Sequence, residues 1–261
     1  MRIVLLTSNR KGTAAYCLPI LLANSDAEIV HVIYCERVKK KKLAHYRRKL
    51  KKIAKIGLLG AFNGIRMRKW FAVRSVDGKE ITDIGETCSN NGIPFSVTAG
   101  INSAQTVEIL QSSNPDLGLS LGNSYISSRI FTIPRYGMLN MHGEILPRFQ
   151  NAQSVIWQLY EGSTKTGYTI HKVEKKIDTG AILLQESFPI LFRATLGETV
   201  NATCGEILKR SALGLAKVIS SFEKYNYGSK AQGTGMTYTT PSYRQFLRIA
   251  RNFRKLKAKE Q

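Results

Sequence analysis

The chain has 261 residues, of which 43% are hydrophobic, and its formal net charge is +21. This length fits one large domain, or one domain with a small appendage. Apolar runs stay well below the ~20 residues that a membrane-spanning helix needs, which excludes an integral membrane protein. The first apolar run is also too short for a signal peptide, so we expect a cytoplasmic protein, with the inner face of the membrane as a possible peripheral location.

The four cysteines are scattered along the chain and form no C-x-x-C pair. This pattern argues against a disulfide framework and against a zinc site, so we expect no metal. The residues are Cys17, Cys35, Cys88 and Cys204.

The predicted elements begin with short β-branched or apolar runs that alternate with segments of helical length. This alternation is typical of βαβ units. We therefore predict an α/β fold with a Rossmann-like, mostly parallel sheet and helices on both faces. The predicted strands are 2–8, 28–35, 93–97, 117–122 and 137–142, and the intervening helices include 12–24 and 103–113.

Two further strands, 166–173 and 181–190, are predicted to form a hairpin-like pair around an Asp-Thr-Gly turn. A helix over 196–225 follows, then the glycine-rich connector 227–235, and then a basic helix after Pro241. Since glycine and serine pack no core, the connector is the expected internal boundary. We divide the chain into a catalytic domain (1–190, with a basic helical insertion at 37–69) and a C-terminal helical extension (191–261).

The basic insertion carries most of the positive charge. Fourteen of the 39 basic residues and none of the 18 acidic residues lie between positions 37 and 69. Leu43, Tyr46, Leu50 and Ile53 recur there at helical spacing. Such a helix could lie on an anionic membrane surface, contact nucleic acid or grip a phosphate-rich ligand. Equally, it could be a surface helix whose apolar stripe packs on the domain.

The first strand-to-helix turn lacks the glycines of a nucleotide fingerprint. It reads SNRKGTA, with one glycine where G-x-G-x-x-G is needed, and no Walker-type loop occurs. Backbone N–H groups at the start of the helix favour an anion, and Arg10 and Lys11 add charge. The turn either holds a phosphate of the substrate or is an ordinary turn.

The strand at 137–142 ends with two polar side chains on one face. Residues i and i+2 of a strand point the same way, so Asn140 and His142 project together, at the strand end where α/β folds bind ligands. Asp178 lies in a turn that can bring a carboxylate to this edge. An amide, an imidazole and a carboxylate suffice for acyl transfer between nitrogens, because the amide stabilises the oxyanion and the imidazole moves protons.

Four pieces in this order resemble the formyltransferase superfamily that uses 10-formyltetrahydrofolate: GMLNMH (137–142), LPR (146–148), TGYTIH (166–171) and IDTGAIL (177–183). The resemblance implies that Asn140 binds the formyl oxygen, that His142 stabilises the intermediate, and that Asp178 tunes His142. It also implies pterin recognition by backbone groups of Ser124, Tyr125 and Ile126 and of the segment around Ile177. His171 is expected to be structural.

The segment after His142 departs from the family pattern. Gly143 and Glu144 replace the Pro-Ser or Pro-Gly pair that commonly follows the histidine, and Asn151 replaces a glycine. Because this segment borders the acceptor pocket in the family, the departures bear on which acceptor the protein uses. The candidate substrate-binding residues are Arg10, Lys11, Gly143, Glu144 and Arg148.

Chain length and the tail at 239–256 are most like those of the nucleotide-sugar N-formyltransferases. The resemblance implies a nucleotide-linked amino sugar as acceptor, such as a 4-amino-4,6-dideoxyhexose, a role in O-antigen and lipopolysaccharide synthesis, and a homodimer. The alternatives are a methionyl-tRNA or glycinamide ribonucleotide formyltransferase, and a non-catalytic relative that binds nucleic acid or a membrane. Within the leading interpretation, nucleic acid is not an expected partner.

Overall fold

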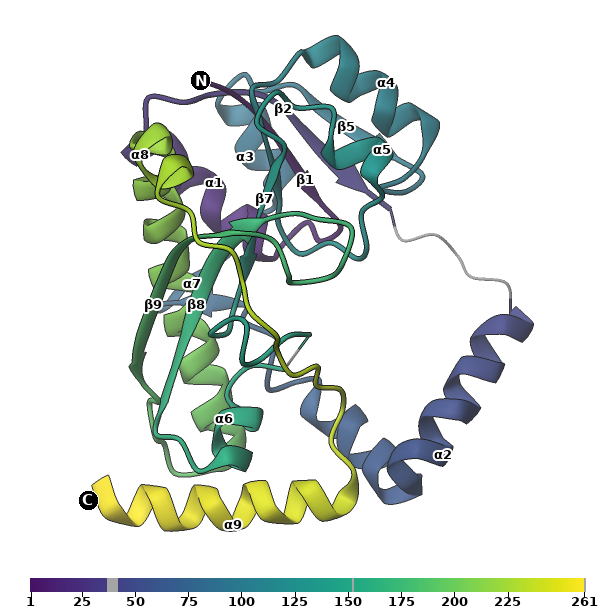
Figure 1. Ribbon diagram of the computed structural model, residues 1–261, viewed down its shortest axis with the longest axis vertical. Coiled ribbons are helices and arrows are strands. Elements are labelled where there is room, and N and C mark those ends of the chain that lie inside the picture. The colour runs from purple at the N-terminus through teal and green to yellow at the C-terminus, as the bar shows by residue number, and fades with distance from the viewer. Residues whose placement is uncertain (37–41, 152, 261) are drawn as a thin grey trace.

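The computed structural model describes residues 1–36, 42–151 and 153–260. Its main sheet has seven strands in the order β5-β2-β1-β6-β7-β8-β9 (Figure 1). The first five of these are parallel, whereas β8 pairs antiparallel with β7, and β9 pairs antiparallel with β8. The strands are β1 (Arg2–Thr7), β2 (Glu28–Cys35), β5 (Phe95–Thr98), β6 (Leu117–Ser120), β7 (Met138–His142), β8 (Lys165–Lys172) and β9 (Ile182–Pro189). The predicted mostly parallel α/β sheet is confirmed.

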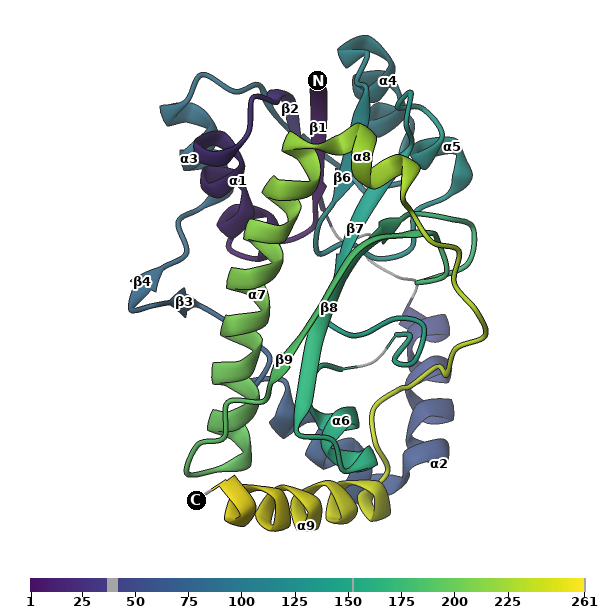
Figure 2. The same ribbon diagram turned by 60° about the vertical axis from the view of Figure 1, so that its left-hand side comes forward.

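Helices cover both faces of this sheet (Figure 2). Strand β1 is apolar at consecutive positions because Ile3 and Leu5 pack into one core cluster and Val4 and Leu6 into the other. The larger cluster lies under α1 (Thr13–Asn24), α3 (Ile84–Asn90) and α7 (Leu196–Ser220). The smaller one lies under α4 (Ala104–Ser113) and α5 (Ser128–Phe131).

One short hairpin, which joins β3 (Ser75–Val76) to β4 (Lys79–Glu80), was not predicted from the sequence. Helix α6 (Ile156–Glu161) follows β7. The predicted helix at 196–225 is instead two helices, α7 and α8 (Phe222–Tyr227), because Ser221 leaves the helical region. Elements of two to six residues show too little periodicity to be recognised in a sequence.

Helix α2 (Lys42–Met67) forms most of the basic insertion and bends at Gly57, where φ is 76° and ψ is 164°. It packs on the terminal helix α9 (Tyr243–Glu260), and a Cβ on Gly60 would lie 3.2 Å from the backbone nitrogen of Tyr243. Positions 37–41 and the Leu43 side chain of the predicted helix lie outside the described residues. Among the helices that are described, none is long and apolar enough to cross a membrane.

The C-terminal segment shares the larger core of the catalytic domain. Leu215 of α7 and Phe253 of α9 belong to the same cluster as Leu5 of β1. In the connector, which we expected to pack no core, Lys230 pairs with Ile182, and just after it Thr237 pairs with Gln150. These bridges attach the connector to the segments that carry the candidate site.

Candidate active site

Strand β7 presents Asn140 and His142 on one face, and the antiparallel strand β8 places His171 directly opposite Asn140. The amide nitrogen of Asn140 donates to Nε2 of His171 over 3.2 Å, and Nδ1 of His171 donates to the carbonyl of Lys172 over 2.8 Å. Burial lowers the pKa of His171, so its imidazole is neutral with the proton on Nδ1. His171 was expected to serve only the fold; instead it fixes the orientation of the Asn140 amide.

The loop between β8 and β9 brings Asp178 to these residues. Asp178 adopts a φ of 55°, and its carboxylate is almost buried. Its Oδ2 lies 3.7 Å from Nδ1 of His142 and accepts a hydrogen bond of 2.9 Å from the backbone N–H of Asn151. Its Oδ1 lies 3.7 Å from Nε2 of His171. The amide, imidazole and carboxylate predicted from the sequence therefore lie together.

A backbone carbonyl fixes the tautomer of His142. Nε2 of His142 donates to the carbonyl of Phe149 over 2.9 Å. In the neutral imidazole, Nδ1 is then the nitrogen that can accept a proton, and this atom faces Asp178. The hydrogen bond to Phe149 thus orients the His142 ring so that Nδ1 points at the carboxylate of Asp178.

The segment just after the connector supports the loop that contacts His142 and Asp178. Gln150 donates its N–H to Met236 and accepts from the N–H of Tyr238, with distances of 2.9 and 3.0 Å. The ring of Tyr238 stacks on Phe149 with centroids 5.5 Å apart. Sequence reasoning missed Tyr238, since backbone pairing between distant segments leaves no local pattern.

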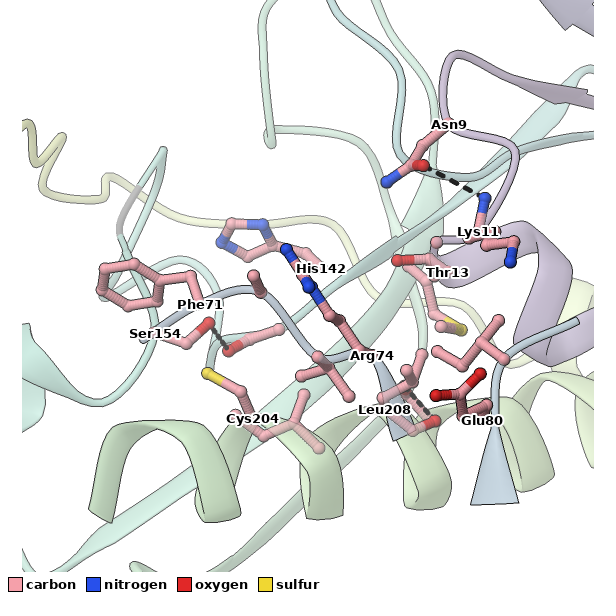
Figure 3. A pocket seen from close by; sticks show the side chains of 18 residues that line it. Asn9, Lys11, Thr13, Phe71, Arg74, Glu80, His142, Ser154, Cys204 and Leu208 are labelled. Atoms are coloured by element: carbon pink, nitrogen blue, oxygen red, sulfur yellow. Dashed lines mark hydrogen bonds between the residues drawn. The ribbon is translucent and has the colours of Figure 1, made fainter. Parts of the chain in front are cut away.

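Two cavities meet at the end of β7. The first, which we call the α7 cavity, has a volume of about 700 Å³ (Figure 3). The second, the loop cavity, has a volume of about 490 Å³ and contains Asn140, His171 and Asp178 in its wall. Both cavities are lined by Thr13, Met141 and His142. His142 therefore lies between two spaces that can each hold a ligand.

The loop cavity contains every residue predicted to bind the donor. These are Ser124, Tyr125, Ile126 and Ile177. The side chains of Tyr125 and Ile177 are 51% and 56% exposed, although both are large and partly apolar. Gln153 also lines this cavity, and its buried Oε1 has no hydrogen-bond partner within the described ranges. A ligand with N–H groups would satisfy that oxygen.

The α7 cavity combines cationic side chains with an apolar wall. Lys11 and Arg74 both line it, and neither has an ion-pair partner among residues 1–36, 42–151 and 153–260. Figure 3 shows the Arg74 side chain directed into the cavity towards His142. Burial raises the pKa of Cys204 in the wall to about 12, so this thiol is not a nucleophile at neutral pH.

Three of the predicted acceptor residues lie away from this cavity. The guanidinium of Arg10 pairs with Asp83 at 2.7 and 2.8 Å, and this contact lowers the pKa of Asp83. Arg148 is exposed and stacks over Phe149, 5.3 Å from the ring centroid. Glu144 is fully buried. Of the predicted acceptor residues, Lys11 and Gly143 do line the cavity.

Glu144 supports the floor beneath the site. Its Oε1 accepts a hydrogen bond of 3.1 Å from Val155, whose φ of 72° is strained for a β-branched residue. Its Oε2 has no partner in the part of the chain that the structure describes. Burial raises the pKa of Glu144 well above its ordinary value of 4.5. The protonated carboxyl is therefore the form that the fold stabilises.

We expect Glu144→Gln to remove a pH dependence of stability. A carboxyl whose pKa is raised by folding contributes stability that is complete below its unfolded pKa and is lost as pH rises through its folded pKa. The amide keeps the acceptor for Val155 and does not ionise. The melting temperature of the variant, relative to that of the wild type, should increase as pH rises from about 4. A constant difference, equal to that of the exposed control Glu223→Gln, would contradict this role.

The mostly parallel seven-stranded sheet is the fold expected of a formyltransferase, and the comparisons confirm the predicted resemblance to that superfamily. Residues 96–206 match the family described as "Formyl transferase".

Two curated relatives, named for different acceptors, have similar identity to this chain. A methionyl-tRNA formyltransferase of Clostridium acetobutylicum is 29% identical over 160 residues, covering 60% of this chain and 50% of the relative. A GDP-perosamine N-formyltransferase of Brucella melitensis is 31% identical over 144 residues, covering 54% of this chain and 53% of the relative. The chain thus spans about half the length of these relatives.

Solved structures show the same fold. An N-formyltransferase from Helicobacter canadensis, in complex with folinic acid and dTDP-3-aminofucose, has a TM-score of 0.57 and 16% identity, covering 97% of this chain and 80% of that one. A glycinamide ribonucleotide transformylase from Symbiobacterium toebii has a TM-score of 0.59 and 18% identity, covering 89% of this chain and 94% of that one.

Proposed function

We propose that this chain is an enzyme that transfers a formyl group from 10-formyltetrahydrofolate to the amine of a nucleotide-linked amino sugar. The observation that carries the proposal is the meeting of two cavities at His142, with Asn140 and Asp178 beside it. The relatives that act on sugars, and the neighbour solved with folinic acid and a dTDP-linked aminosugar, support the choice of donor and acceptor.

The donor fits the loop cavity in chemical terms. The unpartnered Oε1 of Gln153 can accept from an N–H of a pterin, and Tyr125 and Ile177 offer apolar surface to a flat ring. The donor would supply an activated formyl carbon next to Asn140 and His142. The acceptor would then occupy the α7 cavity on the other side of His142.

In the proposed reaction, Asn140, His142 and Asp178 each move a proton or stabilise a charge. As the acceptor amine forms its bond to the formyl carbon, the free N–H of Asn140 donates to the oxygen on which negative charge develops. Nδ1 of His142 accepts the proton that the amine loses, and Asp178 stabilises the resulting imidazolium. Collapse of the intermediate breaks the bond to N10 of tetrahydrofolate, and the proton passes from His142 to that nitrogen.

The direct test is an assay with 10-formyltetrahydrofolate and a panel of GDP-, UDP- and dTDP-linked amino sugars. We expect one sugar to gain the mass of one CO. Transfer only to methionyl-tRNA or to glycinamide ribonucleotide would replace this acceptor with one of the two alternatives. No transfer to any amine would favour a non-catalytic binding protein.

Arg74→Ala is expected to raise the KM for the nucleotide sugar by about tenfold or more, with little change in kcat. The substitution removes a guanidinium from the cavity that would hold the diphosphate. Because a hydrogen bond to a charged group contributes ~1.5–3 kcal/mol, its loss should weaken acceptor binding by about this much. The control is Arg135→Ala, an exposed arginine before the amino-terminal end of β7. An equal effect of both substitutions would show that the charge acts only at long range.

We further propose that this reaction serves O-antigen and lipopolysaccharide synthesis. This role, the homodimer and the cytoplasmic location remain predictions, as does the division of the chain at position 190.

A further inference from the structure

The second half of α2 has two opposite faces, of which the fold uses one. The inner face is buried and packs on the protein. It consists of Ile56, Gly60, Asn63 and Met67. The outer face carries large apolar side chains that are 78%, 58%, 66% and 61% exposed. These are, in order, Leu58, Leu59, Phe62 and Ile65, which we call the outer stripe.

The spacing of the outer stripe places its members side by side. Positions 58, 62 and 65 are separated by four and three residues, which aligns side chains on one face of a helix. The inner face already provides the contacts that hold α2 against α9. Packing among the residues that the structure describes therefore does not explain the outer stripe. A contiguous apolar patch of this kind marks an interaction surface.

The positive charge of the basic insertion indicates which kind of partner the outer stripe binds. The sequence contains fourteen basic and no acidic residues between positions 37 and 69. Lys51, Lys52 and Lys55, which precede the bend at Gly57, are all exposed. A second copy of this chain would bring the same positive charges together and would be repelled. Nucleic acid would satisfy the lysines but not Leu58 or Phe62. An anionic lipid bilayer offers both phosphate groups and an apolar interior.

We propose that α2 is a membrane-surface helix, which lies in the interface of an anionic bilayer with the outer stripe inserted below the headgroups. The exposed lysines that precede the bend contact lipid phosphates, and their aliphatic stems lie along the apolar layer. In the first half of the helix, before the bend, Tyr46 and Leu50 are also exposed, by 61% and 65%.

This surface adjoins the candidate active site. Lys51, Lys52 and Lys55 line a hollow of about 500 Å³ together with Asn151 and Gln153. Asn151 and Gln153 also line the loop cavity that contains Asp178. Membrane contact through α2 would therefore hold the reaction centre close to the bilayer. The proposal does not rest on the proposed function, because membrane binding is measured without substrates.

The test is co-sedimentation of the full chain with vesicles of phosphatidylcholine alone and of phosphatidylcholine mixed with phosphatidylglycerol. We expect binding to the anionic vesicles, weakened by moderate salt, and little binding to phosphatidylcholine alone. Leu58→Ser with Phe62→Ser should weaken vesicle binding by about tenfold or more for each side chain. Lys51→Gln, Lys52→Gln and Lys55→Gln together should weaken it by about a hundredfold at low salt.

Matched controls separate a specific surface from general charge and hydrophobicity. Tyr227→Ser removes a side chain that is 96% exposed on α8, and Lys217→Gln, Lys224→Gln and Lys230→Gln remove the same charge from exposed positions elsewhere. Both controls should bind vesicles like the wild type. All variants should keep the melting temperature and the rate of transfer to a soluble acceptor.

Three results would overturn the proposal. The first is an absence of binding to anionic vesicles at both salt concentrations. The second is an equal loss of binding in the controls. The third is a change of oligomeric state in the Leu58 and Phe62 variant without any change in vesicle binding, which would make the outer stripe an interface between copies. Since none of these readouts is formyl transfer, failure here leaves the proposed function standing.

Discussion

Replacing His142 with asparagine is expected to lower kcat by about a hundredfold to ten-thousandfold while the folate ligand still binds. Nδ1 of His142 is the basic nitrogen of the site, because Nε2 already donates to the carbonyl of Phe149. Asparagine removes that base and the cation that Asp178 stabilises. The measurements are steady-state formyl transfer and equilibrium binding of folinic acid, which reports on the loop cavity.

His31→Asn provides the matched control. His31 is half-buried on β2 and bonds through Nε2 to Ser96 over 2.8 Å, outside both cavities. This substitution should leave kcat near the wild-type value. If His142→Asn retained full turnover, the imidazole of His142 would not be the group that accepts the proton. If it abolished folinic acid binding, His142 would belong to donor recognition instead.

The sequence predicted the part of the site that depends on local geometry. Asn140 and His142 could be placed on one face because a strand repeats every two residues, and their position at a strand end followed from the βαβ pattern. Asp178 could be placed near this edge because it lies in the turn between two predicted strands. Its role came from the resemblance, since a carboxylate in a loop has no local pattern that directs it. The structure gathers these three side chains as predicted.

The rest of the site depends on contacts between distant segments. His171 could be recognised only with the β7–β8 register, which pairs it with Asn140. Arg74 enters the α7 cavity from the segment before a hairpin of two-residue strands, which sequence periodicity does not reveal. Glu144 follows the catalytic strand and carries a charge, so it was assigned to the acceptor, yet the structure buries it completely. Burial of a single polar residue depends on tertiary packing, which the local pattern does not specify.

Asn140→Ala is expected to lower kcat by about a hundredfold to a thousandfold, which is the usual effect of removing one oxyanion donor. The KM for either substrate should change little, because the interaction strengthens only as negative charge develops on the formyl oxygen. The wild-type site holds this amide by its bond of 3.2 Å to His171. The measurement is kcat and KM for formyl transfer.

The same geometry predicts that His171 is a positioning residue that acts through Asn140. His171→Ala should lower kcat by a smaller factor than Asn140→Ala. The double variant should be no slower than Asn140→Ala alone, because once the amide is absent its orientation has no further effect on the oxyanion. Multiplicative losses in the double variant would show that His171 acts independently, through its contact of 3.7 Å with Asp178. His171→Gln should recover part of the rate that His171→Ala loses, because the glutamine oxygen can accept a hydrogen bond from the Asn140 amide. A purely structural role of His171 would show no such rescue.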